Sequence, residues 1–380
     1  MAEGSHMIIG VLGLVLVGIV LWDAFETVLV PRRIGRKIRL TRYFYLFAWA
    51  VWRAIAARER RLSPREALLG FFGPLSLILL LGIWAIGLIA AFAMLQSVAA
   101  SAAERAHASA GSLLYMSGET FFTLGFGDVT PQTALGRLFA VMEAGLGFGF
   151  LGTVIGYLPT LYASFAQREI EISLLDTRAG SPPSACEFLR RLPAGDADAH
   201  RDEVLRAWER WAAQLLETHI SYPQLAYYRS QHINQSWLAA LTTILDSTAL
   251  LLARSENKRD VPARRAFAMA RHALVDLSQI FVPRYTPARE DRLTPETLAK
   301  LKAALAGTQM ALPETEEFEK RLTRIRLLYE PYALALAERL LFTLPGWVAA
   351  EGARDNWQGG PWDRQLGLAS PDAAANTEHF

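Results

Sequence analysis

The chain has 380 residues, of which 52% are hydrophobic and only 20% are charged, and its formal net charge is +2. It is long enough for two domains and too apolar for an ordinary soluble protein. The single cysteine, Cys186, excludes an intrachain disulfide framework, so stability must come from packing and oligomerisation.

The N-terminal segment predicts a membrane span. Residues 1–6, Met-Ala-Glu-Gly-Ser-His, have the character of an expression-tag remnant, and residues 7–30 are apolar and, at about 36 Å, long enough to cross a bilayer. A cleaved signal peptide is disfavoured, because the segment has no basic beginning and no small-residue cleavage site. Asp23 and Glu26 lie in its last turns. We expect them to pair with nearby arginines at the membrane interface, in preference to forming an ion or proton site.

Residues 31–67 form a basic segment with many arginines and only two acidic residues, Glu59 and Glu66. The positive-inside rule places such a segment in the cytoplasm. Within it, residues 43–57 are apolar and aromatic but too short to span, which predicts an interfacial helix. The basic side chains of residues 32–65 would then reach the anionic head groups of the inner leaflet. No helix carries the regular arginine ladder of a voltage sensor.

A long apolar run, a small polar turret and a short apolar segment follow in turn. Residues 68–96 are predicted as an outer membrane helix and residues 97–111 as the turret on the far side. Residues 112–122 would be about 16 Å long as a helix, too short for a hydrocarbon core of about 30 Å. A half-length helix is tolerated at membrane depth only where the backbone after it is buried in protein or lines a water-filled cavity. The pattern therefore predicts a re-entrant pore loop.

The residues after this short segment suit cation binding. They are Thr123, Leu124, Gly125, Phe126, Gly127 and Asp128. Gly125 and Gly127 have no Cβ, so the backbone can adopt angles that point successive carbonyls the same way. A ring of such carbonyls, with the Thr123 hydroxyl at its inner end, can replace the hydration shell of a cation. The negative C-terminal end of the short helix would face the same ion.

This hexapeptide closely resembles the Thr-Val-Gly-Tyr-Gly-Asp filter of the potassium channel superfamily, and the two flanking helices extend the resemblance over residues 68–166. The resemblance implies a bacterial-type two-helix pore domain in which carbonyls hold K⁺, here those of Thr123, Leu124, Gly125 and Phe126. Two residues depart from the pattern. Phe126 replaces the usual tyrosine and removes a hydroxyl that can tether the filter. Phe122 replaces a frequent threonine and makes the wall behind the innermost ion site more apolar.

Three residues are expected to support the filter: Glu119, Tyr115 and Phe122. Glu119 lies one helical turn before Thr123. In some members of the superfamily an acid at this position shares a proton with the filter aspartate, here Asp128. Two carboxyls in close, water-poor contact cannot both ionise cheaply, so a shared proton would make conduction sensitive to pH. The alternative is a Glu119 that caps the helix or faces water.

Residues 137–166 are predicted as the inner pore helix and are rich in glycine. The candidate gating residues are Glu143, Gly145, Gly147, Gly149, Gly152 and Pro159. The glycines are explained either by close packing of helices or by a hinge over residues 145–152, with Pro159 adding a kink. Glu143 is a charge within the membrane, so we expect it to line the cavity or to bond to the pore helix of a neighbouring subunit.

After residue 167 the chain changes character. Residues 167–345 show helical periodicity, with amphipathic runs at 197–219, 235–255, 263–281, 295–306 and 313–342. Residues 236–253 are apolar enough for a further span, but their threonines and Asp246 favour a buried bundle helix. No βαβ alternation, Gly-x-Gly-x-x-Gly motif or cyclic-nucleotide-binding β-roll is visible. An all-helical cytoplasmic domain is predicted.

No chemistry beyond conduction is predicted. His219, His232 and His272 lack metal-ligand spacing and are interpreted as core or surface histidines. Residues 219–229 form an aromatic and polar cluster, either a small-ligand pocket or, as we favour, a corner between helices. No nucleophile-base constellation or phosphate loop is present, so we predict no enzyme activity, no cofactor and no nucleic-acid partner. Residues 346–380 are predicted to be a disordered tail.

One pore loop supplies one quarter of a filter, so the sequence predicts an all-α, homotetrameric potassium channel. Three membrane helices and one re-entrant pore helix put the N-terminus outside and the helical domain inside a multi-pass inner (plasma) membrane protein. Two alternatives stay open: a weakly selective cation channel, and a non-conducting membrane sensor or scaffold. The ligand or protein that meets the helical domain is not indicated.

Overall fold

The computed structural model describes residues 2–30, 39–101, 109–193, 196–255, 260–282, 291–350, 352–353, 355–358 and 362. Over these ranges the chain is helical and contains no strand, which confirms the predicted all-α class. The chain divides into two compact units. The membrane unit comprises residues 1–58 and 71–163, and the helical unit comprises residues 59–70 and 164–380. Parts of the predicted basic segment and of the turret, and most of the predicted tail, lie outside the described residues.

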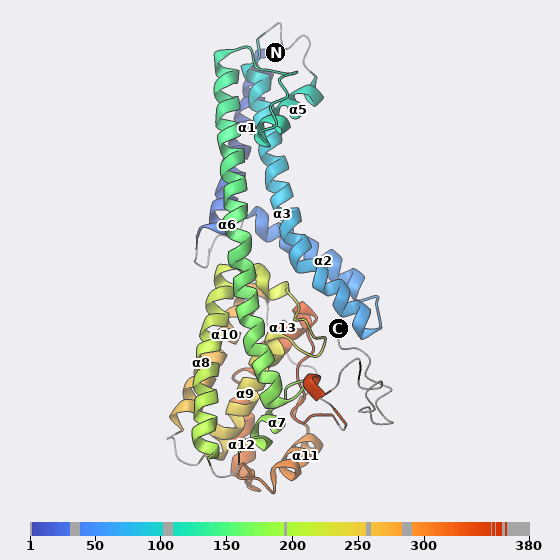
Figure 1. Ribbon diagram of the computed structural model, residues 1–380, viewed down its shortest axis with the longest axis vertical. Helices are drawn as coiled ribbons and strands as arrows, with labels where there is room; N and C mark the ends of the chain where they lie inside the picture. The colour runs from blue at the N-terminus through green and yellow to red at the C-terminus, as the bar shows by residue number, and fades with distance from the viewer. Residues whose placement is uncertain are drawn as a thin grey trace. The chain divides into compact units, whose positions relative to one another are not determined.

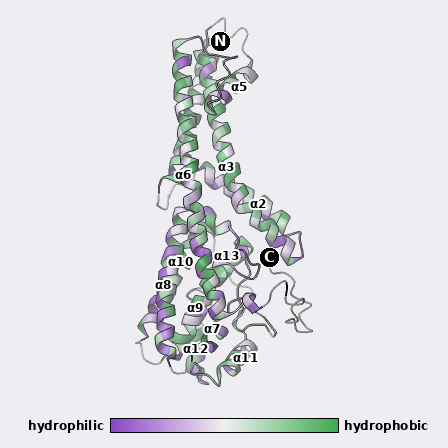
Figure 2. Ribbon diagram, viewed as in Figure 1, coloured by the Kyte–Doolittle hydropathy of each residue, from purple (hydrophilic) through white to green (hydrophobic). Residues whose placement is uncertain are grey.

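The membrane unit is built on long apolar helices. Its elements are α1 (Ala2–Val28), α2 (Leu40–Ala56), α3 (Leu62–Ala99), α5 (Ala110–Phe121) and α6 (Ala134–Ala179), of which α3 and α6 continue into the helical unit. Of these, α1, α3 and α6 are long and apolar enough to span a membrane. They run alongside one another in Figure 1, with the short α5 beside them, and Figure 2 shows their apolar colouring. The protein is therefore a multi-pass membrane protein.

The core of the membrane unit joins α1, α3 and α5. It contains Val20, Leu80, Trp84, Leu88 and Phe121, each no more than 2% exposed. Small residues let the backbones approach closely, as helix packing in lipid requires. At Gly13 of α1, for example, an added Cβ would lie 2.9 Å from the carbonyl oxygen of Ala91 in α3.

The two acids at the end of α1 hold the start of α2. Asp23 is buried and accepts hydrogen bonds from the backbone N–H of Thr41 at 3.1 Å and from Trp84 Nε1 at 3.0 Å. Glu26 lies 3.3 Å from Arg39 Nε. The predicted pairing with arginine is thus confirmed for Glu26, whereas Asp23 has no arginine partner among the described residues, which leave out residues 31–38. Asp23 instead satisfies an N–H in the first turn of α2, where helices leave donors free and favour negative charge.

The helical unit packs around α9. Its further elements are α7 (Ala185–Arg190), α8 (Ala197–Ser221), the 3₁₀ turn η1 (Pro223–Tyr227), α9 (Trp237–Arg254), α10 (Val261–Phe281), α11 (Pro295–Leu305), α12 (Glu316–Arg326), α13 (Glu330–Leu340) and η2 (Asn356–Gln358). α9 is long and apolar enough to span a membrane, yet nearly all of it is buried among α7, α10, α12 and α13. Its threonine hydroxyls bond to the backbone of α9 itself, as that of Thr242 does to Leu238 O at 2.7 Å. This agrees with the prediction of a bundle helix.

Two predicted helices differ from those observed by more than a small shift of their ends. The run 313–342 is broken into α12 and α13 at residues 327–329, because Pro331 in the first turn of α13 has no N–H to continue the preceding helix. The break directs Tyr329 inward, where its hydroxyl donates to Asp246 Oδ1 at 2.5 Å. The inner helix, expected to end at residue 166, continues without interruption to Ala179.

Candidate functional site

The pore loop begins with a short helix that is capped at both ends. Ser109 and Ser112 form a capping box at the start of α5, with Ser112 N donating to Ser109 Oγ at 3.0 Å. At its end the backbone N–H groups of Thr123 and Leu124 still donate back to the last turn, at 3.1 and 2.8 Å. The helix therefore leads directly into the filter sequence, with its negative C-terminal end beside Thr123.

The backbone of the filter sequence adopts a left-handed conformation at every second residue. Thr123, Gly125 and Gly127 have φ values of +56°, +66° and +79°. Left-handed angles at every second residue turn successive carbonyls away from the alternating directions of an ordinary strand and towards one side. Thr123 is β-branched, and such a residue at positive φ is rare and strained, which is typical of a functional segment.

Three large apolar side chains of the loop are uncovered in the single chain. Phe122, Leu124 and Phe126 are 59%, 58% and 69% exposed. A clustered apolar surface of this kind marks a contact with other protein or with lipid.

The predicted supports of the filter lie close to its aspartate. The phenol of Tyr115 is near enough to the carboxylate of Asp128 to interact with it electrostatically. Glu119 is buried, and within the described residues of the single chain its Oε2 has no hydrogen-bond partner. The proton shared by Glu119 and Asp128 stays a prediction.

Glu143 joins the three helices of the pore module. It is fully buried in α6 and hydrogen-bonds to the hydroxyl of Ser117 in α5, which lies 2.7 Å from the carbonyl oxygen of Ile89 in α3. The prediction that Glu143 lines a cavity is wrong, because none of its surface is exposed. The observed bond is to the pore helix of the same chain, whereas the prediction named the pore helix of a neighbouring subunit. The sequence does not predict that Ser117 binds Glu143, because no local pattern links two residues that are 26 positions apart.

The glycines of α6 fall into two groups. A Cβ on Gly147 would lie 1.9 Å from the carbonyl oxygen of Phe121, at the C-terminal end of α5, so packing explains this glycine. At Gly145, Gly149 and Gly152 an added Cβ would meet no atom within 4 Å. The hinge therefore stays a prediction for these three residues and for Pro159, which lies inside the continuous helix.

In the helical unit, residues 225–229 contact one residue of α3 and one residue of α6. We call residues 225–229 the anchor segment. Arg168 in α6 donates to Leu225 O at 2.9 Å and to Tyr228 O at 3.0 Å. Arg229 donates to Leu340 O at 2.6 Å and lies 3.7 Å from the carboxylate of Glu66, near the start of α3. Burial lowers the pKa of Arg229 to about 10. The predicted cluster 219–229 is thus a corner between helices, and the cavity at Arg168 is only about 10 Å³.

His219 lies beneath Arg168 and is completely buried. Its Nδ1 donates to Leu215 O at 2.8 Å, which leaves the lone pair of Nε2 facing Arg168 Nη1 at 3.4 Å. Burial, and then the charge of Arg168, hold the pKa of His219 well below its usual range. Among the described residues, no three His, Cys, Asp or Glu side chains are grouped to hold a metal ion.

Comparison with protein-family models matches residues 77–163 to a family described as ion channel. Residues 77–163 are thus similar to the two-helix, potassium channel-like ion channel family. The match covers α5, the filter sequence and most of the membrane-spanning parts of α3 and α6, which we call the channel module. A comparison with curated proteins and another with solved structures each found no match.

Proposed function

We propose that the chain is a subunit of a homotetrameric, potassium-selective channel whose filter is formed by residues 123–128. The observation that carries the proposal is the left-handed backbone at Thr123, Gly125 and Gly127, directly after a half-length helix in a membrane unit. Carbonyls turned to one side are what a cation needs in place of its water. In the filter, K⁺ would be held by the carbonyls of Thr123, Leu124, Gly125 and Phe126.

The homotetramer follows from the geometry of a single pore loop. One loop provides one side of an ion path, and four identical loops related by cyclic symmetry close it. The exposed Phe122, Leu124 and Phe126 offer apolar surface for neighbouring subunits and for the module behind the filter. Light scattering of the detergent-solubilised protein tests this, with a tetramer expected and a monomer contradicting the proposal.

In the membrane we place the N-terminus outside and the helical unit in the cytoplasm of a bacterial-type cell. The amphipathic α2 exposes Tyr43, Phe47 and Val51, which suits a helix lying in the inner leaflet, with neighbouring arginines on anionic head groups.

The helical unit would steady or open the gate through the anchor segment. Because Arg168 belongs to α6 and Glu66 to α3, a movement of residues 225–229 acts on both pore helices together. The ligand or partner that moves this segment is not identified by its chemistry.

One observation favours a second candidate, a weakly selective cation channel. Phe126 has no hydroxyl to tether the filter, and Phe122 puts an aromatic ring beside its inner end. Flux into liposomes under potassium, sodium and N-methylglucamine gradients separates the candidates. Potassium-only flux supports the proposal, and equal potassium and sodium flux supports the weakly selective channel. A complete lack of flux would support a non-conducting membrane sensor or scaffold.

A further inference from the structure

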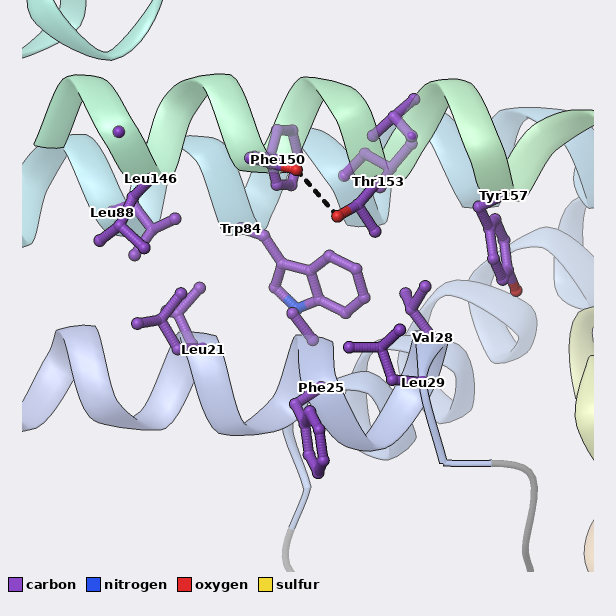
Figure 3. Close-up of a pocket in the computed structure, with 16 residues that line it drawn as sticks. Leu21, Phe25, Val28, Leu29, Trp84, Leu88, Leu146, Phe150, Thr153 and Tyr157 are labelled. Atoms are coloured by element: carbon purple, nitrogen blue, oxygen red, sulfur yellow. Dashed lines mark hydrogen bonds between the residues drawn. The ribbon is translucent and has the colours of Figure 1, made fainter.

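The membrane unit contains an apolar cavity of about 270 Å³ between α1, α3 and α6. Figure 3 shows Leu21 and Phe25 from α1, Trp84 from α3, and Phe150 and Tyr157 from α6 around it. All of its lining residues except Leu29, which directly follows α1, belong to helices long and apolar enough to span a membrane. The cavity therefore lies between segments that lipid chains can reach, along the last turns of α1.

Two glycines of α6 help to create this space. Gly145 and Gly149 both line the cavity, and a Cβ on either would meet no atom within 4 Å. The other candidate-hinge glycine, Gly152, does not line it. The cavity thus abuts the part of α6 where bending is proposed.

Two of the polar groups in the lining are already bound within the protein. The hydroxyl of Thr153 donates to Gly149 O at 2.8 Å, as the dashed line in Figure 3 marks, and Trp84 Nε1 donates to Asp23. None of the described residues that line the cavity has a charged side chain. Water is unstable in such a space, whereas an engineered apolar cavity of about 150 Å³ stays dry and takes up benzene.

We propose that this cavity binds a hydrocarbon chain of a membrane lipid. Lipid hydrocarbon is the abundant apolar material around membrane-spanning helices, and it forms no hydrogen bonds. A chain seated there would contact Gly145 and Gly149 and would restrain the bending of α6. The binding itself does not depend on the proposed function; only its effect on conduction rests on the channel proposal.

Trp84 provides a direct probe, because its ring lines the cavity and is only 2% exposed. The full chain is reconstituted in phosphatidylcholine vesicles whose acyl chains carry bromine, which quenches nearby indoles. The difference in emission between the wild-type protein and Trp84→Phe isolates the Trp84 signal. We expect this signal to be strongly quenched relative to vesicles without bromine.

Gly149→Leu fills the cavity, and Gly156→Leu is its matched control. Gly156 lies two turns further along the same stripe of α6, also has no atom within 4 Å of an added Cβ, and does not line the cavity. We expect Gly149→Leu to lose most of the Trp84 quenching and Gly156→Leu to keep it. Native mass spectrometry should likewise show fewer retained lipids for Gly149→Leu than for Gly156→Leu.

Two outcomes would overturn the proposal. An unquenched Trp84 in the wild-type protein would mean that the cavity is closed or filled by a neighbouring subunit. Equal quenching in the wild-type and Gly149→Leu proteins would mean that Trp84 senses only surrounding lipid. Quenching without ion flux would support the lipid site while contradicting the channel function, so the two proposals fail separately.

Discussion

Gly147 in α6 lies so close to Phe121 that a Cβ on this glycine would come within 1.9 Å of the Phe121 carbonyl oxygen. The inner helix therefore presses its bare backbone against the end of α5, directly before the filter sequence. Any side chain at residue 147 must push α5 away from α6.

The first prediction concerns this contact. Gly147→Ala should lower the free energy of unfolding by about 1–3 kcal/mol, the usual cost of overpacking, and should reduce flux because α5 carries the filter. Gly152→Ala is the control, because its Cβ meets nothing and alanine favours a helix by about 0.5–1 kcal/mol over glycine. Thermal unfolding in detergent measures both variants. Equal melting temperatures would remove the packing explanation.

The second prediction concerns Glu143 and its partner Ser117. Glu143→Gln keeps the size of the side chain and its ability to hydrogen-bond, so stability should change little. Glu143→Ala removes the link to α5 and should cost about 1–3 kcal/mol. In a double-mutant cycle with Ser117→Ala, the two substitutions should be non-additive by at least about 0.5 kcal/mol. Strict additivity would show that the two residues do not act together.

The third prediction is a pH dependence caused by His219. Burial and the charge of Arg168 lower its pKa in the folded chain. Below about pH 6.5 the imidazole is therefore protonated in the unfolded chain but stays neutral in the folded chain. The free energy of unfolding is therefore at its full value above that pH. It decreases by up to about 1.4 kcal/mol per pH unit as the pH falls towards the lowered pKa. Melting temperatures of His219→Gln should depend less on acid than those of the wild-type protein.

His272 is the control for this measurement, because its side chain is 61% exposed and it lies far along the sequence, in α10. His272→Gln should keep the acid sensitivity of the wild-type protein. The same loss of sensitivity in both histidine variants would show that burial of His219 is not its source.

The fourth prediction concerns the anchor segment. Arg168→Met removes the two hydrogen bonds that this buried charged group makes to the anchor segment, each typically contributing about 1.5–3 kcal/mol, together with its ion pair to Glu169. Arg190→Met is the control, because its partner Glu187 is bound at the surface, where such pairs contribute about 0–1 kcal/mol. Both stability and the open fraction in flux assays should change only for Arg168→Met. An unaltered open fraction would argue against coupling through this segment.

Much of the channel module could be predicted from the sequence because its signals are local. A hydrophobic run too short to span, bounded by two longer runs, predicts a half-length helix, and α5 ends one residue before the predicted residue 122. The two glycines of the filter sequence likewise predict positive φ values at their positions. The break before α13 also had a visible signal, Pro331, which the amphipathic pattern of residues 313–342 obscured.

The contacts that were not predicted join residues distant in sequence. Asp23 meets Trp84 across 61 positions, and Arg168 meets the carbonyl of Tyr228 across 60. Periodicity gives the buried face of a helix but not the neighbour that covers it. The packing role of Gly147 belongs to the same class, because a glycine in a pattern does not reveal which backbone approaches it.

The most direct test of the potassium channel proposal is the reversal potential of single channels in planar bilayers with potassium on one side and sodium on the other. The proposal predicts a reversal potential displaced strongly towards that of a potassium-only pore. Gly127→Ala, which puts a Cβ on a residue with a φ of +79°, should abolish this current. For the wild-type protein, a reversal potential near zero, with potassium and sodium carried equally, would contradict the proposal of a potassium-selective channel.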